Sequence, residues 1–282
     1  MPGNRADMLN KALSFAADAY MPDMEDSVPA SEKKRARETI ESHLPTLTQA
    51  GPLVIPRVNS IQTGLMNDDL ASVVGPHIYG VSVGKVNSAA DVQRIAGILN
   101  FLETRVGIEQ GLTKLVVWIE SALAIVNAYD ICVASQRVVA AAFGAEDLTN
   151  DMAIERTIKG SEIAYARNAI SIAAKAAGIL ALDTPYFGLN DADGLKQDTA
   201  AARGCGFDGK FAIHPEQLEI INKAFGPSAA EVDNAKSIVA AFEKAERAGK
   251  GAISLDHKVI DAPVVKRARK LLKLARSRQK GV

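Results

Sequence analysis

The sequence predicts an α/β fold, in particular a (β/α)8 TIM-type barrel followed by a C-terminal helical lid extension. Short runs rich in Val and Ile alternate with longer amphipathic stretches, which is typical of parallel strands joined by helical crossovers. Polar side chains follow the carboxyl ends of these runs. Barrel enzymes collect catalytic residues from many strand ends, whereas an open sheet gathers them at one switch point. Seven polar strand ends therefore favour the barrel over a doubly wound sheet, although each one alone also fits an ordinary polar loop.

The strands and helices of the barrel follow from this periodicity. The apolar runs, flanked by Gly, Pro or Asp, predict strands at Ala19–Met24, Leu53–Val58, Ile78–Val83, Lys114–Ile119, Val138–Phe143, Gly178–Leu182 and Gly209–Ile213. The amphipathic stretches predict helices at Ser31–His43, Thr63–Val74, Ser88–Val106, Ala122–Ala134, Ile154–Ala177 and Asp191–Arg203. A barrel needs one strand more, and Pro2-Gly3-Asn4-Arg5 has the composition of a loop after a strand. We therefore expect a truncated first strand that belongs ahead of Met1, unless a strand elsewhere escapes the pattern.

The pattern changes after Phe225-Gly226-Pro227. Ser228 and Glu231 form a capping box before a helix that runs to about Ala248. The glycine-bearing stretch Gly249–Lys258 follows, and a basic helix ends near Arg278. No strand is expected among these helices. The sequence therefore predicts a barrel domain over residues 1–227 and a helical lid or oligomerisation segment over residues 228–282.

Composition excludes several classes of protein. The 282 residues are 48% hydrophobic, with 33 Lys and Arg against 33 Asp and Glu, so the chain can form a large core and is not disordered. Balanced charge argues against a nucleic-acid binder. No uncharged apolar run reaches the roughly 18 residues of a membrane span, and no signal-peptide pattern is present. Cys132 and Cys205 have no metal-binding or disulfide spacing. We expect a cytoplasmic protein with a small-molecule substrate, and neither nucleic acid nor membrane as a partner.

Carboxylates at the predicted strand ends are the first candidates for chemistry. Glu120 and Asp147 end neighbouring strands, and two hard oxygen ligands without nearby Cys or His suit Mg²⁺. Asp23, Glu25 and Asp26 could orient water molecules around such an ion. The alternative for each acid is a helix cap or a loop salt bridge. That alternative is weakest for Glu120, which directly follows an apolar run.

Other charged residues offer further roles. Arg57 at a strand end could bind a substrate carboxylate or stabilise a developing oxyanion, or could form a structural ion pair with Asp23 or Asp26. Asp261, just before the basic helix, could close over the barrel mouth. The basic helix is typical of a solvated face, with a membrane, nucleic acid or ligand phosphate as alternatives. No GxSxG, GxGxxG or Walker pattern occurs, so nucleotide-loop and serine-hydrolase chemistry lack support.

Taken together, the motifs resemble the citrate lyase β-subunit-like family, the CoA-ester lyases of the HpcH/HpaI aldolase superfamily, over nearly the whole chain. They are Pro2-Gly3-Asn4-Arg5, Asp23-Met24-Glu25-Asp26, Arg57-Val58-Asn59, Ile119-Glu120-Ser121-Ala122, Phe143-Gly144-Ala145-Glu146-Asp147-Leu148, Gly209-Lys210 with Ile213-His214-Pro215, and Ile260-Asp261-Ala262-Pro263. Two positions depart from the family pattern. Pro22 removes a strand donor, and Gly84 precedes Lys85 where family members often have proline.

The resemblance implies a Mg²⁺-dependent lyase that splits a malyl-, citramalyl- or citryl-CoA type 3-hydroxyacyl-CoA into a 2-oxo acid and acetyl-CoA. It implies that Glu120 and Asp147 bind the metal and that Arg57 offsets charge on the reacting oxygen. Arg5 would contact the CoA phosphates, and Gly144 and Ala145 would border the substrate. Asp261 would serve as acid/base from a neighbouring subunit of a homo-trimer or hexamer.

Three alternatives stay open at this point. A thioesterase of the same family would have nearly the same motifs. An aldolase of free hydroxy-oxo acids ordinarily lacks the Ile-Asp-x-Pro segment that this chain has. A catalytically silent subunit or binding protein could keep the fold alone. Retention of the metal-site acids, Arg57 and Asp261 argues against this last alternative, and a truncated first strand argues for it.

Overall fold

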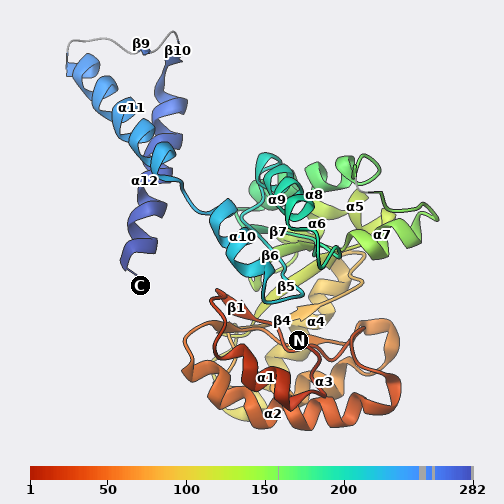
Figure 1. The fold of residues 1–282 in the computed structure, drawn as a ribbon. Helices are drawn as coiled ribbons and strands as arrows, with labels where there is room; N and C mark the ends of the chain where they lie inside the picture. Colours follow the sequence, from red (N-terminus) through yellow and green to blue (C-terminus); the bar gives the residue numbers. More distant parts are fainter. Residues whose placement is uncertain (158, 248–251, 256–257, 281–282) are drawn as a thin grey trace. The chain divides into compact units, whose positions relative to one another are not determined.

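The structure is a computed structural model that describes residues 1–157, 159–247, 252–255 and 258–280 (Figure 1). The chain divides into two compact units, Met1–Ile221 and Asn222–Val282, which are described separately. Strands and helices alternate through the first unit, as the sequence predicts. Within the described residues, no helix is both long and apolar enough to cross a membrane.

The strands of the first unit lie side by side in sequence order, and all of the described pairs are parallel. The pair β1-β2 joins Ala19–Tyr20 to Leu53–Val54. A sheet of six described strands then runs β3 (Arg57–Val58), β4 (Gly80–Val83), β5 (Lys114–Ile119), β6 (Val138–Phe143), β7 (Leu180–Asp183) and β8 (Gly209–Lys210). Sequential parallel pairing of this kind is the strand order of a (β/α) barrel.

Prolines shorten the first two predicted strands. Pro22 and Pro56 have no N–H to donate, so the regular pairing of each strand is interrupted at these positions. The chain nevertheless stays extended there, because the Arg57 N–H donates to the Pro22 carbonyl and the Met24 N–H donates to the Arg57 carbonyl, both at 2.8 Å. The predicted strands Ala19–Met24 and Leu53–Val58 therefore exist as parallel neighbours, in shorter pieces.

The N-terminus pairs with the next segment as a strand would. The Asp23 N–H donates to the Met1 carbonyl and the Gly3 N–H donates to the Asp23 carbonyl, both at 2.8 Å, and Pro2 forms a parallel bridge with Asp23. Gly3 permits this approach, because a Cβ there would lie 2.7 Å from the Asp23 carbonyl oxygen. Met1–Gly3 thus lies where the first strand of a barrel is expected, and the strand predicted ahead of Met1 stays a prediction.

The sheet curves strongly around its core. Trp118 on β5 stacks on Phe211, which directly follows β8, with ring centroids 4.6 Å apart. In a flat sheet, strands three places apart would be separated by about 14 Å. The same apolar cluster contains Ile55 and Met21 from the first strands and Leu182 from β7. Side chains from most strands therefore meet on one concave side, which is the packing of a barrel interior.

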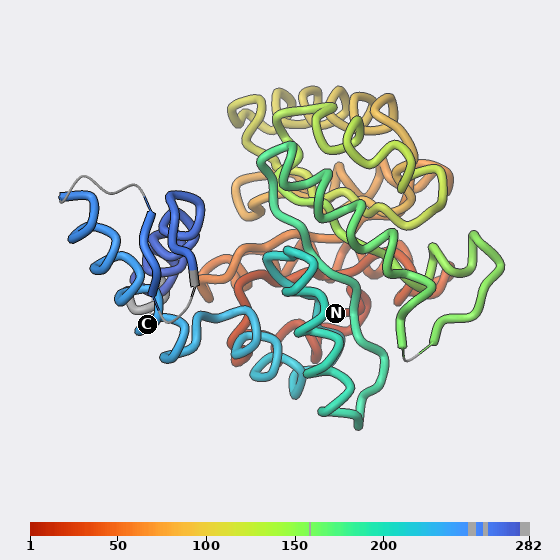
Figure 2. Tube along the Cα trace, turned by 90° about the horizontal axis from the view of Figure 1, so that it is seen from above, coloured from red at the N-terminus to blue at the C-terminus, as the bar shows by residue number. Residues whose placement is uncertain are grey.

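Helices connect the strands and cover the outer side of the sheet. In chain order they are α1 (Ala6–Ala12), α2 (Lys33–Gln49), α3 (Met66–Val73), α4 (Ala89–Val106), α5 (Ala122–Val126), α6 (Ala128–Val133), α7 (Ala145–Asp151), α8 (Ala164–Ala177), α9 (Ala192–Gly204) and α10 (Gln217–Phe225), with single 3-10 turns at Ala30–Glu32 and Ile61–Thr63. Helices α4, α6 and α8 lie next to one another in that order (Figure 2). The sequence did not predict the short helices α1, α7 and α10.

Two predicted helices need correction. Helix α8 begins at Ala164, ten residues later than predicted, because Gly160 has a left-handed φ of +64° and Glu162 accepts hydrogen bonds from the N–H and hydroxyl of Thr157. The predicted helix Ala122–Ala134 divides at Asn127, whose side chain donates 2.9 Å to the Asn87 carbonyl. Local polar contacts outweigh helical periodicity at both places.

The second unit is a pair of helices with a small hairpin between them. Helix α11 (Ala229–Arg247) starts at the predicted capping box, in which Ser228 and Glu231 bond each other reciprocally, and α12 spans Ala262–Lys280. The prediction of no strand here is wrong, because β9 (Ile253–Leu255) and β10 (Lys258–Ile260) pair antiparallel. Ile253 and Ile260 pack with Phe242 in the core of this unit, and that burial stabilises the hairpin. The predicted helix end at Ala248 and residues 249–251 and 256–257 of the predicted connecting stretch lie outside the described residues.

Candidate active site

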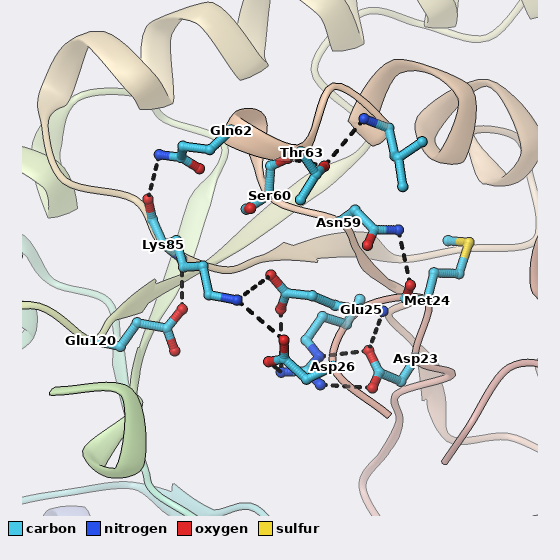
Figure 3. A network of polar contacts seen from close by, with 12 residues as sticks. Asp23, Met24, Glu25, Asp26, Asn59, Ser60, Gln62, Thr63, Lys85 and Glu120 are labelled. Atoms are coloured by element: carbon cyan, nitrogen blue, oxygen red, sulfur yellow. Dashed lines mark hydrogen bonds and ion pairs between the residues drawn. The ribbon is translucent and has the colours of Figure 1, made fainter. Parts of the chain in front are cut away.

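A cluster of charged side chains lies where β1, β3, β4 and β5 end (Figure 3). Asp147 joins it from the first turn of α7, which follows β6. In the described structure, the carboxylates of this cluster belong to Asp23, Glu25, Asp26, Glu120 and Asp147, and Arg57 and Lys85 form ion pairs with the first three. Lys33 and the N-terminal ammonium add positive charge on the Asp23 side, which leaves Glu120 and Asp147 without an ion-pair partner of their own among the described residues. An unbalanced group of acids at strand ends is poised to attract a cation.

Glu120 is the most strongly perturbed acid of the cluster. It follows β5 directly, is 5% exposed, and accepts a 2.6 Å hydrogen bond from the Lys85 N–H. Burial, followed by the charges of Asp147 and Glu25, raises the pKa of Glu120 to about 8. Burial raises the pKa of Asp147 and of Glu25 as well. The folded protein therefore disfavours full ionisation of these acids unless a positive charge joins them.

Two glycines shape the space around Glu120. A Cβ on Gly144 would collide with the carboxylate oxygen and the Cβ of Glu120. A Cβ on Gly84 would lie 2.8 Å from Glu25 Oε2 and 3.0 Å from Glu120 Oε1. Both positions must lack a side chain so that the carboxylates of two different segments can approach each other. In this chain, Gly84 is thus required by the site.

Lys85 connects the two groups of acids. Its ammonium lies 3.3 Å from Glu25 Oε1 and 3.2 Å from Asp26 Oδ1, while its N–H bonds Glu120 (Figure 3). Burial disfavours the ammonium, but these carboxylates outweigh it and hold the pKa of Lys85 above its usual range. The residue has a left-handed φ of +56°, a backbone conformation that is unfavourable for any residue with a Cβ. The strained backbone of Lys85 thus directs both its N–H and its ammonium towards the acids of the same site.

Arg57 is held by the acids of the Asp23–Asp26 segment. Its Nε and Nη2 each donate 2.7 Å to the carboxylate of Asp23, and its guanidinium lies 5.7 Å from the Trp118 ring centroid. Although burial acts in the opposite direction, Arg57 lowers the pKa of Asp23 to about 2. The third nitrogen, Nη1, lies 3.4 Å from Glu25 and 3.5 Å from Asp26. The structural ion pair considered from the sequence is therefore present, and Nη1 faces the acidic cluster.

Residues that the sequence did not single out hold this segment in place. Lys33 donates 2.7 Å hydrogen bonds to the carbonyls of Met24 and Glu25, and Asn59 donates 2.9 Å to the Met24 carbonyl. Asn59 is fixed in turn by the buried carboxylate of Asp69. The Lys33 and Asp69 contacts span 8 to 10 residues and the Asn59–Met24 contact spans 35, and no spacing rule connects these residues. Only the Arg57-Val58-Asn59 motif pointed to one of them.

The remaining predicted site residues lie in other surroundings. Arg5 is exposed and forms a two-point pair with Asp7 at 2.9 and 3.0 Å. Gly144 and Ala145 begin the turn into α7, beside Glu120. Asp261 belongs to the second unit and accepts a 3.2 Å hydrogen bond from the Val264 N–H at the start of α12. The structure therefore brings Asp23, Glu25, Asp26, Arg57, Glu120 and Asp147 together and pairs Arg5 with Asp7 instead. Asp261 belongs to the second unit, which is described by itself.

The cluster has the chemistry of a site for a hard divalent cation. Within the described residues, no three His, Cys, Asp or Glu side chains form a ready-made metal cage. Glu120 and Asp147 supply hard oxygens, and the buried Glu25 Oε2 accepts no hydrogen bond among the described groups, with only the ion-pair contact to Arg57 at 3.4 Å. Mg²⁺ is typically bound by one or two carboxylates together with oxygens from substrate and solvent. The raised pKa values and the buried Glu25 oxygen therefore fit such an ion.

The fold is that of a barrel-type α/β protein, and it carries the acidic cluster at the carboxyl ends of its strands, where barrel enzymes have their active sites. The family model of HpcH/HpaI aldolase/citrate lyase matches residues 1–215. The chain belongs to this family, which confirms the family resemblance and the enzyme class, that of carbon–carbon lyases.

Known proteins similar to this chain carry related activities. The citrate lyase subunit beta of Leuconostoc mesenteroides subsp. cremoris is 38% identical over 98% of this chain and 91% of its own length. A (3S)-malyl-CoA thioesterase of Cereibacter sphaeroides is 34% identical over 96% and 91%. The protein CitE from Mycobacterium tuberculosis, in complex with magnesium, acetoacetate and coenzyme A, has a TM-score of 0.79 at 28% identity, covering 98% of this chain and 96% of that one. That similarity confirms the TIM-barrel-like fold.

Proposed function

We propose that this chain is a Mg²⁺-dependent CoA-ester lyase. It splits a 3-hydroxyacyl-CoA of the malyl-, citramalyl- or citryl-CoA type into a 2-oxo acid and acetyl-CoA. The observation that carries the proposal is the pair Glu120 and Asp147 with raised pKa values at neighbouring strand ends. The magnesium and coenzyme A bound by the M. tuberculosis relative support it.

Each part of the reaction has a candidate residue in the cluster. Glu120 and Asp147 hold the ion, which supplies positive charge next to the substrate hydroxyl that becomes the keto oxygen. Arg57 Nη1, which contacts Glu25 and Asp26 at 3.4 and 3.5 Å and makes no bond to Asp23, offsets charge on the reacting oxygen when substrate is bound. Asp23, Glu25 and Asp26 fix Arg57 and Lys85 around that space.

The substrate's CoA portion has its own candidates. Gly144 and Ala145 border the acyl group, since the Gly144 backbone lies against the Glu120 side chain. Arg5 reaches the CoA phosphates. It has to leave Asp7 to do so, which costs little because solvent screens an ion pair between two exposed side chains.

Asp261 completes the proposed site as the acid/base that exchanges a proton with the acetyl carbon. The proposal includes a homo-trimer or hexamer in which Asp261 of one subunit serves the cluster of another. The carboxylate already has one defined contact, the Val264 N–H, which sets its direction at the start of α12.

Purified protein with Mg²⁺ is expected to release a 2-oxo acid from at least one of malyl-, citramalyl- and citryl-CoA. Trapping the product with phenylhydrazine measures it, and excess EDTA should remove the activity until Mg²⁺ is restored. Absence of product from all three substrates contradicts the lyase proposal. The substrate that reacts identifies the keto product, because each of the three esters yields a different 2-oxo acid. The sequence leaves this choice open, since a methyl or carboxymethyl group changes binding by only a few kcal/mol.

A subunit-mixing experiment tests the role of Asp261. Asp261→Ala and Glu120→Ala proteins should each be inactive, and the mixture should regain activity because some sites then combine both intact residues. The exchange of subunits is verified first by native mass spectrometry. Persistent inactivity after verified exchange rules out a site shared in this way. Activity of Asp261→Ala alone rules out the acid/base role.

A thioesterase is the second candidate, favoured by the malyl-CoA thioesterase relative. The same reaction mixtures discriminate the two, because a thioesterase releases free CoA without a 2-oxo acid. A thiol reagent measures the CoA and phenylhydrazine the keto product in parallel samples.

A further inference from the structure

A second charged network lies buried at the carboxyl ends of β7 and β8. Arg167 donates to Asp183 at 3.0 and 3.2 Å and to Asp198 at 2.7 Å. Lys210 donates to the same two carboxylates at 2.5 and 2.6 Å. The Lys210 and Asp183 side chains are fully buried. The two cations and two acids balance, so this network, unlike the acidic cluster, is complete without a further ion.

This network extends to the turn that carries Asp147. The ammonium of Lys210 also donates 2.6 Å to the carbonyl of Thr184. The hydroxyl oxygen of Thr184 accepts a 3.3 Å hydrogen bond from the Ala145 N–H. Thr184 is 1% exposed, so water cannot easily replace its hydroxyl. A continuous path of contacts thus runs from the buried ions to Ala145, two residues before Asp147.

The geometry points to Thr184 as a positioning residue for the proposed cation site. Its hydroxyl sets the start of the Gly144–Asp147 turn, and Lys210 holds Thr184 in place by its carbonyl. Gly144 packs against Glu120 in the same turn, so displacement of this turn changes both proposed metal ligands together. This inference rests on the proposed function for the identity of the bound ion.

Two substitutions remove the contact from opposite sides. Thr184→Val keeps the shape of the side chain and leaves the Ala145 N–H unpaired, whereas Thr184→Ser keeps the hydroxyl. Ala145→Pro removes the donor at the first residue of α7, a position where helices accept proline. Thr199→Val is the matched control, because Thr199 is equally buried and donates 2.6 Å to the Leu195 carbonyl within α9.

The full-length variants are titrated with Mn²⁺ by calorimetry, and their kcat, KM and hydrogen exchange over residues 143–148 are measured. Thr184→Val and Ala145→Pro should each bind Mn²⁺ about tenfold more weakly, as for other groups that orient metal ligands. Their combination should lose no more than either alone, because both remove one contact. Thr184→Ser and Thr199→Val should stay within about twofold of the wild type, and exchange should increase in Thr184→Val alone among the threonine variants.

The outcomes test two separate statements, the positioning role of Thr184 and the proposed function. Unchanged Mn²⁺ affinity in Thr184→Val, equal losses in Thr184→Val and Thr199→Val, or additive losses in the double variant would overturn the positioning role while the lyase proposal stands. If Thr184→Val fails to fold, Ala145→Pro carries the same test with Thr184→Ser as reference. Wild-type protein that binds no Mn²⁺ and cleaves no substrate contradicts the proposed function, and the inference with it.

Discussion

Glu120→Gln should abolish metal binding and cleavage while raising the melting temperature of the metal-free protein. The amide keeps the shape of the side chain and can still accept from the Lys85 N–H, but it brings no charge to a cation. Loss of one carboxylate ligand removes several kcal/mol of transition-state stabilisation, so kcat/KM should fall on the order of a thousandfold. Steady-state kinetics and Mn²⁺ calorimetry measure both losses.

The stability gain follows from the raised pKa of Glu120. Its folded pKa of about 8 lies above the ordinary value of 4.5 that applies to the unfolded chain. Below pH 4.5 Glu120 is protonated in both the folded and the unfolded chain, and burial of its neutral carboxyl carries no ionisation penalty. As pH rises from 4.5 towards and through 8, the unfolding free energy falls, because the unfolded chain ionises Glu120 more readily than the folded one. The variant has no such loss. Its advantage in melting temperature, measured in EDTA, should therefore be absent near pH 4 and greatest near pH 9.

Neighbouring acids supply the controls for Glu120. Asp147→Asn should lose activity in the same way, because its carboxylate is the second proposed ligand. Glu146→Gln should retain activity within about twofold, since Glu146 is exposed and pairs with Arg156 at 3.1 Å. Glu120→Gln or Asp147→Asn that keeps more than a tenth of wild-type activity refutes the metal assignment. An unchanged melting temperature at pH 9 would mean that Glu120 is not buried among acids as the structure has it.

The fold was predictable from sequence where the periodicity was undisturbed. The buried strands Lys114–Ile119 and Val138–Phe143 match their predicted bounds, because an uninterrupted apolar run of this length is typical of a strand buried on both faces. Errors in the predicted elements arose where a single residue interrupts the regular hydrogen bonding or where a distant contact stabilises a strand. Pro22 and Pro56 remove strand donors, Gly160 delays a helix, and the hairpin β9-β10 depends on burial against Phe242 that no local pattern reveals.

The members of the acidic cluster were predictable from the sequence, whereas most of the contacts among them were not. Polar residues after apolar runs pointed to Glu120, Asp147 and the Asp23–Asp26 segment, because parallel strands end on one side. The contact of Gly84 with Glu25, and that of Lys85 with Glu120, join segments that are far apart in the sequence. Such contacts depend on sheet curvature and turn geometry, which residue spacing does not encode.

Arg57→Lys should nearly abolish activity although it conserves the charge. Arg57 uses two nitrogens on Asp23 and keeps Nη1 towards Glu25 and Asp26, whereas one ammonium cannot serve both directions. Loss of a donor to a developing oxyanion lowers kcat by about 10²–10³-fold. The unfolding free energy should fall by about 1.5–3 kcal/mol, since a charge-assisted bond to buried Asp23 is broken. Steady-state kinetics and urea unfolding measure these two effects.

Arg137→Lys separates the two contributions, because Arg137 makes the same kind of two-point pair with buried Glu103, at 2.9 and 2.6 Å, just before the amino end of β6. It should lose comparable stability and keep the wild-type kcat, since Arg137 precedes β6 and Glu120 follows the parallel neighbour β5, which puts them at opposite ends of the sheet. If Arg57→Lys loses only stability, as Arg137→Lys does, Arg57 is a structural ion-pair partner of Asp23 and takes no part in the reaction. A loss of kcat confined to Arg57→Lys assigns Nη1 to the substrate oxygen, because both substitutions keep the charge and break a two-point pair with a buried carboxylate.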